Sequence, residues 1–321
     1  MKILMFQLGK IGDMILLTAV FKAIKEKYPD ASVSVLAGRR NHFILKNNPN
    51  IDKIYIYEKT PVKIIKLICR LRQQKYDYWI DAKDHYSSES KLFAKLSKAK
   101  TKVGFNKEDN KVFDIAVPTE QENTNLHFIE RAFNALSCLD IKINSTEIPK
   151  PELFEVTDSI DYVSLFINTI KNDKIITLNL SASSEKRMWQ IEKWQQLINS
   201  IEETGSVVIS TAPEHRQLAE GLKKSNPKIN IFQSRNYDDV ISLIKKSTLL
   251  ITPDTSLVHV ATAFDTPVIV LIGGHEGNFN KFRPLSTHQN IIRANEDNDL
   301  IQSIDAEDVI GAYQNIRQVI T

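Results

Sequence analysis

The sequence has little cysteine: of its 321 residues only Cys69 and Cys138 carry thiols, and they lie far apart. This scarcity gives no support to a disulfide framework or a zinc cluster. Both cysteines fall in apolar helical patterns, so we expect buried thiols in a reducing compartment. Long apolar runs are also missing, since none approaches the roughly 18 residues of a membrane-spanning helix. Lys10 and Asp13 interrupt the first 23 residues and argue against a signal peptide. The sequence therefore predicts a cytoplasmic protein.

A strong excess of one charge is absent from the whole chain, whose net charge is +3, but residues 59–102 are an exception. Between Lys59 and Lys102 the acidic residues are only Asp77, Asp81, Asp84 and Glu89. The basic residues there are Lys63, Lys66, Arg70, Arg72, Lys75, Lys83, Lys91, Lys95, Lys98 and Lys100. Such a run is either a solvated helical face or a surface for an anionic acceptor or anionic lipid headgroups. Nucleic acid is disfavoured, because no exposed aromatics are interleaved with the basic residues.

The apolar periodicity predicts two successive α/β series, and 321 residues with 42% hydrophobic content suffice for two cores. The first has strands at 2–7, 32–37, 51–56, 76–81, 102–105 and 112–117 and helices at 14–28, 61–74, 87–97 and 124–138. The second has strands at 175–180, 206–210, 229–232, 249–251 and 268–272 and helices at 158–172, 191–203, 214–224, 238–246 and 305–320. Alternation with short links predicts parallel sheets covered on both faces. Pro149 and Pro151 punctuate a linker over 143–155, so we place the domains at 1–150 and 151–321, with a ligand cleft between them.

The stretch from Thr252 to Phe264 predicts a strand, a turn and a helix. Pro253 ends the strand, and Asp254 or Thr255 caps the helix. The free N–H groups and positive dipole end of that helix would favour a phosphate or carboxylate. The residues alone leave the identity of this anion open.

The turn from Gly9 to Asp13 joins the first predicted strand to the first predicted helix. It is not a dinucleotide fingerprint, because the third glycine is missing and Ala37, not an acidic residue, ends the next strand. A Rossmann dehydrogenase is therefore disfavoured. Asp13 either caps the helix or acts as a general base, with Gly9 and Gly12 allowing a substrate to approach the backbone.

The loop after Asn179 contains several hydroxyl groups and Arg187, and a guanidinium can grip a diphosphate through two oxygens. The alternative is a polar surface loop. His259 is more typical of a structural hydrogen-bond donor than of a catalyst. We take the run from Asp297 to Asp299 as solvent-exposed and not as a metal site. No Ser-His-Asp, Cys-His or zinc arrangement is readable.

Taken together, these segments resemble glycosyltransferase family 9, the lipopolysaccharide heptosyltransferases. The similarity lies, in the family's order, in segments 2–4 with 12–18 and 28–31, 76–81 with Lys83, 127–131, 179–189 with Arg187, and 252–259. The last of these matches the family's nucleotide-site motif most closely. The resemblance spans nearly the whole chain, which makes it more specific than any single motif.

The resemblance implies a GT-B fold, in which two Rossmann-like domains face a central cleft, with the acceptor in the N-terminal domain and the donor in the C-terminal one. Its last helix can pack back on the N-terminal domain. The resemblance also implies transfer of heptose or a related sugar from a donor such as ADP-heptose to a lipopolysaccharide core or lipid A–Kdo acceptor. This transfer would invert the anomeric configuration and would need neither a metal nor a cofactor. It would take place in the cytoplasm, peripherally at the inner membrane face. Asp13 would be the catalytic base. Donor-binding residues would be Ser183, Arg187, Asp254, Thr255, Ser256, Leu257 and His259, and acceptor-binding residues Lys10, Gly12 and Lys83.

The sequence departs from the family pattern around the expected donor pocket. Leu180 and Ser181 replace the usual Pro-Gly, Ser256 replaces a common glycine, and Lys10 stands where a small residue is usual. Residues 273–276 lack the Pro and Thr often found there. Two alternatives therefore stay open beside the transferase: a nucleotide-sugar epimerase of the same fold, and a catalytically silent nucleotide-sugar-binding protein.

Overall fold

The structure is a computed structural model that describes residues 1–107, 111–143, 146–170, 174–201, 205–295 and 300–320. The chain divides into two compact units. The N-terminal unit contains Met1–Phe154 together with Asn280–Arg283, and the C-terminal unit contains Glu155–Phe279 together with Pro284–Thr321. No helix among the described residues is long and apolar enough to cross a membrane.

The N-terminal unit is built on a six-stranded sheet in which every pairing is parallel, in the order β3-β2-β1-β4-β5-β6. The strands are β1 (Lys2–Gln7), β2 (Ser32–Gly38), β3 (Lys53–Tyr57), β4 (Tyr78–Asp81), β5 (Thr101–Gly104) and β6 (Ile115–Ala116). The helices are α1 (Ile11–Lys27), α2 (Pro61–Gln74), α3 (Ser88–Ser97) and α4 (Phe128–Asn134), with 3-10 turns η1 (His42–Leu45) and η2 (Ser137–Leu139). This strand order is that of a doubly wound sheet.

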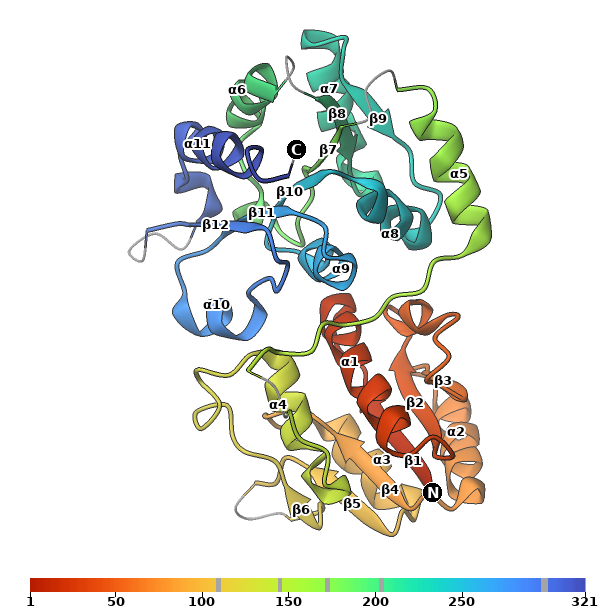
Figure 1. The fold of residues 1–321 in the computed structure, drawn as a ribbon. Coiled ribbons are helices and arrows are strands. Elements are labelled where there is room, and N and C mark those ends of the chain that lie inside the picture. The colour runs from red at the N-terminus through yellow and green to blue at the C-terminus, as the bar shows by residue number, and fades with distance from the viewer. Residues whose placement is uncertain (108–110, 144–145, 171–173, 202–204, 296–299, 321) are drawn as a thin grey trace. The chain divides into compact units, whose positions relative to one another are not determined.

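Helices cover both faces of this sheet (Figure 1). On one face Leu67 and Leu71 of α2 and Phe93 of α3 pack in a core with Phe6 and Trp79 of the sheet. On the other, α1 contacts α4 and η1. The apolar run of β1 is buried throughout, as a strand covered on both sides requires.

The C-terminal unit repeats this plan with an all-parallel sheet in the order β12-β11-β10-β7-β8-β9. Its strands are β7 (Ile175–Asn179), β8 (Ser206–Ser210), β9 (Asn230–Phe232), β10 (Leu249–Pro253), β11 (Val268–Ile272) and β12 (Gln289–Arg293). The helices are α5 (Thr157–Ile167), α6 (Ile191–Ile201), α7 (Arg216–Ser225), α8 (Tyr237–Lys246), α9 (Ser256–Phe264), α10 (Glu276–Phe282) and α11 (Ala306–Ile316). The 3-10 turns are η3 (Glu185–Arg187), η4 (Pro213–His215) and η5 (Ile301–Ser303).

The helices of this unit also lie on both faces of their sheet (Figure 1). One core contains side chains of α6, α7 and α11, and a second joins Val163 of α5 and Leu243 of α8 to the sheet. The last helix, α11, packs against α6, β11 and β12 of its own unit. Only the last part of α10, from Asn280 onward, clusters with the N-terminal unit.

Several sequence expectations need correction. Helix α4 is much shorter than the expected 124–138, because its N-cap is His127. The strand expected over 112–117 is only Ile115–Ala116. The expectation of buried thiols is wrong for Cys69, which is exposed because α2 buries only Leu67 and Leu71; Cys138 is half-buried.

Candidate functional site

In each unit the sequence-predicted site residues lie where the strand order reverses. The reversal falls between β1 and β4 in the first sheet and between β7 and β10 in the second (Figure 1). In doubly wound sheets, ligands bind outside the carboxyl ends of the strands at this switch point. The two candidate half-sites are therefore the loops after β1 and β4 and the loops after β7 and β10.

At the first switch point, Asp13 lies in the first turn of α1 and is half-buried. Its Oδ2 accepts a hydrogen bond from the Lys10 N–H at 3.3 Å, as part of a capping box. The capping role considered for Asp13 is thus real. The same contact fixes the carboxylate at the carboxyl end of β1, where a substrate hydroxyl could reach it.

The pKa of the Asp13 carboxyl is raised above its ordinary value because burial disfavours the charged form. The Lys10 N–H and the charges of Lys10, Lys281 and Lys83 oppose this shift without cancelling it. A carboxylate with a raised pKa is a stronger base than a solvated one, which is the property that general-base catalysis near neutral pH requires.

Because Gly9 has no side chain, the Asp13 carboxylate can lie close to the backbone of residue 9. A Cβ atom at Gly9 would lie 2.6 Å from Asp13 Oδ2 and 2.7 Å from Gln7 Oε1, closer than real contacts allow. The Gly9 N–H also donates to Gln7 Oε1 at 2.9 Å. Any side chain at this position would therefore displace the Asp13 carboxylate and the Gln7 amide, so the glycine serves close approach and not a left-handed conformation.

The predicted acceptor residues surround this point. Lys10 is the exposed N-cap of α1, and Gly12 is buried in its first turn. Lys83 follows β4, with its Nζ 5.5 Å from the centroid of the Phe6 ring. Asp81, which pairs in register with Phe6, is buried at the end of β4, and burial raises the pKa of its carboxyl above the ordinary value.

A buried ion cluster next to this half-site was not predicted. Arg131 Nη1 lies 2.5 Å from Asp84 Oδ2, and Lys281 Nζ lies 3.4 Å from Asp84 Oδ1. Burial by itself would raise the pKa of Asp84, but hydrogen bonds from His85 and Arg131 and the charge of Lys281 hold it well below its ordinary range. Arg131 belongs to the 127–131 family segment, but no sequence signal links Asp84 to Lys281, 197 positions away.

At the second switch point, buried Asn179 ties β7 to β10. Its Nδ2 donates to the Ser181 carbonyl at 3.0 Å and to Thr252 Oγ1 at 2.9 Å, and its Oδ1 accepts from the Ser181 N–H at 3.1 Å. Ser181 Oγ accepts from the Ala212 N–H at 2.8 Å. Ser181, which stands where the family usually has glycine, is thus held in the loop by hydrogen bonds of its backbone and its side chain.

Arg187 and Asp254, which come from the two loops of this half-site, form an ion pair. Asp254 is nearly buried, whereas the Arg187 side chain is 38% exposed and can reach a ligand as well as its partner. Ser183 is exposed in the same loop as Arg187. A guanidinium in this position can bind diphosphate oxygens bidentately.

The start of α9 is the helix end at which the sequence predicts anion binding. Thr255, the N-cap, accepts from the Leu257 N–H at 3.3 Å, which resolves the choice between Asp254 and Thr255 as cap. Ser256 Oγ lies 2.8 Å from the hydroxyl of Tyr237, and Leu257 is buried. The N–H groups of this first turn and the dipole of the helix favour a negatively charged ligand.

His259 is one turn into α9 and buried. Burial lowers the pKa of its imidazole to about 4, so the ring is neutral at physiological pH. A neutral ring can donate or accept a hydrogen bond but adds no charge to the half-site. Asp297 to Asp299, which we interpret as exposed, lie outside the described residues.

Comparison with known proteins now adds to this geometry. The family model of glycosyltransferase family 9 (heptosyltransferase) matches residues 64–308. The lipopolysaccharide core heptosyltransferase OpsX of Haemophilus influenzae is 25% identical over 301 residues, covering 91% of this chain and 84% of that protein. Among solved structures, a family 9 glycosyl transferase from Veillonella parvula has a TM-score of 0.84 at 17% identity, covering 99% and 97% of the chains. The ADP-heptose LPS heptosyltransferase II of E. coli has a TM-score of 0.80 at 18% identity, covering 99% of both.

Two doubly wound units with this similarity define the GT-B fold, and the family match makes the chain a glycosyltransferase. The family match extends over 245 of the 321 residues, from 64 to 308. The chain belongs to glycosyltransferase family 9, the heptosyltransferase family. The roles assigned to individual site residues stay predictions.

Proposed function

We propose that this enzyme transfers heptose, or a related sugar, from a nucleotide-sugar donor such as ADP-heptose to a lipopolysaccharide core or lipid A–Kdo acceptor. Membership of the heptosyltransferase family supports the sugar, and the names of its similar proteins support the ADP-linked donor and the lipopolysaccharide acceptor. In this proposal the enzyme works in the cytoplasm, peripherally at the inner face of the inner membrane.

The observation that carries the proposal is the half-buried Asp13 carboxylate with its raised pKa. Asp13 takes the proton of the acceptor hydroxyl while the hydroxyl oxygen attacks the anomeric carbon of the donor. The bond from that carbon to the phosphate oxygen breaks, and the nucleoside diphosphate leaves with the electron pair. A single displacement of this kind inverts the anomeric configuration. Lys10, Gly12 and Lys83 contact the acceptor, and the two cations suit anionic groups on it.

The donor binds to the C-terminal half-site. Arg187, Ser183 and the first N–H groups of α9 offset the charge that develops on the diphosphate, which is electrostatic stabilisation of the leaving group. Asp254, Thr255, Ser256, Leu257 and neutral His259 contact the ribose, phosphate or sugar. Because these protein groups supply the compensating charge, the proposed transfer needs neither a metal nor a cofactor.

The test is the variant Asp13→Asn, which keeps the shape of the side chain and removes its basicity. General bases contribute on the order of 10²- to 10⁴-fold, so we expect kcat to fall by that factor while the dissociation constant of ADP-heptose stays unchanged. The parent enzyme should lose activity as the pH falls through the raised pKa of Asp13, because the base is then protonated. The assays contain EDTA, and full parent activity there is expected for metal-free transfer.

Asp30→Asn is the matched control, because Asp30 is an exposed carboxylate in a loop of the same unit. It should retain parent kcat. Near-parent turnover by Asp13→Asn would exclude Asp13 as the base. Conversion of the free donor to another sugar nucleotide with no acceptor present would favour the epimerase alternative. Product NMR checks the anomeric inversion.

A further inference from the structure

Helix α2 carries apolar side chains on its outward face. Leu67 and Leu71 are buried against the sheet. Successive helical residues are rotated by roughly 100°, so residues 62 and 69 lie on the side opposite Leu71, with Ile65 next to them. Val62 is 63% exposed and Ile65 62% exposed, and Cys69 is also exposed. These side chains therefore form a small apolar stripe, called the apolar stripe below, on the solvent side of the helix.

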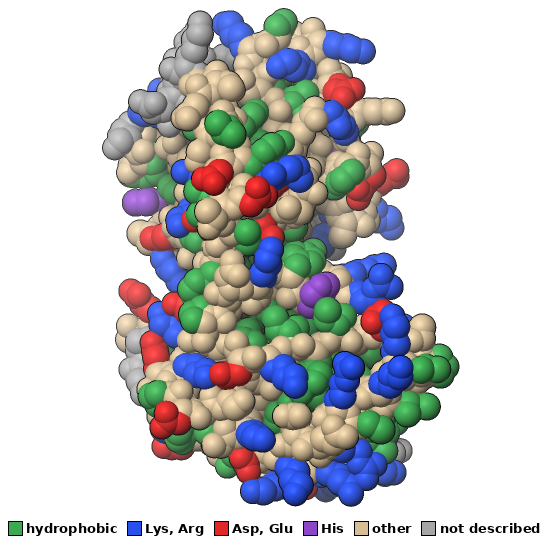
Figure 2. Space-filling view, turned by 90° about the vertical axis from the view of Figure 1, so that its right-hand side faces the viewer, with side chains coloured by type: hydrophobic (Ala, Val, Ile, Leu, Met, Phe, Trp, Pro, Cys, Tyr) green, Lys and Arg blue, Asp and Glu red, His purple; other side chains and the backbone are tan. Residues whose placement is uncertain are grey.

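Cations flank this apolar stripe on both sides. Lys66 and Arg70 follow it on one side of the helix and Arg72 on the other, and all three are exposed. None of the ion pairs formed by the described residues involves these three cations. Helix α2 itself contains no acidic residue. Figure 2, which faces the side where α2 lies in Figure 1, shows Lys and Arg side chains gathered over the N-terminal unit with hydrophobic ones between them.

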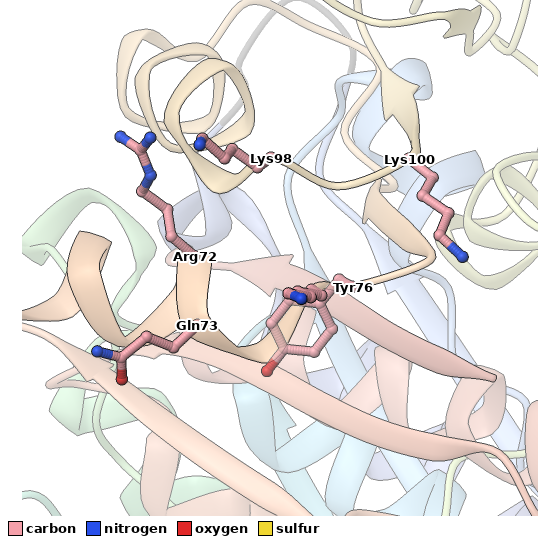
Figure 3. Close-up of a pocket in the computed structure, with 6 residues that line it drawn as sticks. Arg72, Gln73, Tyr76, Lys98 and Lys100 are labelled. Atoms are coloured by element: carbon pink, nitrogen blue, oxygen red, sulfur yellow. The ribbon is translucent and has the colours of Figure 1, made fainter.

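A basic pocket lies at the C-terminal end of the same helix. It is lined by Arg72, Gln73, Lys75, Tyr76, Lys98 and Lys100, from the ends of α2 and α3 and the loops that follow (Figure 3). No carboxylate is among these lining residues. Lys100 is paired with Asp77 at 2.7 Å, which offsets part of the charge, but the other cations give the pocket a net positive field. A headgroup phosphate suits such a pocket.

We propose that the outward face of α2 and its basic pocket, here called the α2 surface, bind an anionic lipid bilayer. An apolar stripe flanked by long cationic side chains is the arrangement of helices that lie in a membrane interface: the apolar residues enter the acyl boundary while the cations reach the phosphates. The helix is about 21 Å long, so the stripe and the pocket at its C-terminal end lie within roughly that distance of each other. The inference deepens the proposed function, and rests on it for the identity of the acceptor as a glycolipid.

The test is co-sedimentation of the full chain with phosphatidylcholine vesicles, with and without phosphatidylglycerol, in the absence of donor and acceptor. We expect binding only to the anionic vesicles, weakened by salt. Lys66→Gln/Arg70→Gln should weaken it about 25-fold, at about fivefold per cation. Val62→Ser/Ile65→Ser should weaken it roughly tenfold or more, because two apolar side chains no longer leave water. Lys224→Gln/Lys246→Gln, with the same change of charge on exposed residues of the C-terminal unit, is the matched control and should bind like the parent.

Parent-like vesicle binding by both α2 double variants would overturn the proposal, as would equal binding to vesicles with and without phosphatidylglycerol. A parent chain that is dimeric by light scattering, with α2 variants that are monomeric, would instead assign the α2 surface to a second copy. Affinity for ADP-heptose is measured on the same variants and should stay unchanged. Transfer to a water-soluble acceptor is also measured on the α2 double variants. Variants that lose vesicle binding but keep this transfer show that the α2 surface acts in membrane binding and not in the transfer itself. A parent chain that binds anionic vesicles but transfers no sugar would contradict the proposed transfer and leave the α2 surface supported.

Discussion

The switch points of the two units share one topology but differ in their electrostatics. At the first, Asp13 and Asp81 have pKa values that burial raises, and neither forms an ion pair among the described residues. At the second, the carboxylate of Asp254 is paired with Arg187, and burial keeps His259 neutral. The same βα scaffold therefore carries a carboxylate with a raised pKa in one unit and a carboxylate paired with a guanidinium in the other.

In the transfer that we propose, this difference would divide the work of one reaction between two units of the same topology. Removing a proton requires a carboxylate that the protein stabilises poorly in its charged form. Binding a diphosphate requires a cation held in place before the ligand arrives, which the Arg187–Asp254 pair provides. Neither requirement is met by the strand order itself; each depends on a few side chains after β1 or β7.

The largest expected effect separates a structural carboxylate, Asp84, from Asp13, the proposed base, in the N-terminal unit. Asp84→Asn leaves Arg131, whose side chain is 3% exposed, without its buried partner, and only Glu120, which is 62% exposed, remains at 4.0 Å. Breaking a buried pair on one side costs about 3–5 kcal/mol, so the free energy of unfolding by urea should fall by that amount. Because the pKa of Asp84 is held low in the folded state, the parent should lose this contribution only as the pH falls below the ordinary range of an aspartate.

Substitution of two other aspartates, Asp77 and Asp13, should change stability much less than Asp84→Asn. Asp77→Asn breaks a pair with exposed Lys100 and should lower the free energy of unfolding by less than about 1 kcal/mol.

Asp13 has a raised pKa, so the folded state binds its proton more tightly than the unfolded chain, and stability falls as the pH rises through that pKa. Asp13→Asn should therefore not destabilise at neutral pH. A loss of several kcal/mol in that variant would contradict the division into structural and catalytic carboxylates.

A smaller effect is expected in the C-terminal unit from Arg187→Gln. The variant loses a charge-assisted hydrogen bond to the diphosphate, worth about 1.5–3 kcal/mol, so the dissociation constant of ADP-heptose should rise about 10- to 100-fold by calorimetry. It also leaves Asp254 as an unbalanced negative charge near the ligand. Arg187→Gln/Asp254→Asn should accordingly bind the donor better than Arg187→Gln alone.

Arg216→Gln controls for the loss of one arginine, since Arg216 forms an exposed i,i+4 pair with Glu220 in the same unit. Its donor affinity should match the parent's. If the double variant binds no better than Arg187→Gln, the ion pair is not part of the donor site.

The sequence predicts the fold well because both series alternate buried strands with amphipathic helices. It misses β12 and α10 for physical reasons. The residues of β12 are only half-buried or exposed at the edge of its sheet, so they lack the apolar run of a central strand. Helix α10 buries no residue among those described, and therefore has no apolar stripe to detect.

The candidate site is only partly readable from the sequence. Asp13, Arg187 and Thr255 follow predicted strands, so the rule that ligands bind at carboxyl ends finds them. The pairing of Arg187 with Asp254 depends on the loops after β7 and β10, whose adjacency is a property of the sheet order. Exposure of Cys69 was missed because an apolar pattern does not say which of its residues face the core.

The smallest expected effect on catalysis or donor binding concerns Gly9. In Gly9→Ala the new methyl group would lie 2.6 Å from Asp13 Oδ2, so the carboxylate must move, and its three nearest atoms all belong to Asp13 and Gln7 of the same unit. A displaced base loses part of its alignment with the acceptor, and we expect kcat to fall on the order of tenfold with the affinity for ADP-heptose unchanged. Gly221→Ala on α7, where a methyl group meets nothing within 4 Å, should keep parent kcat. If Gly9→Ala weakened donor affinity and left kcat intact, the switch point after β1 would serve the donor, and the contrast between the two units would be lost.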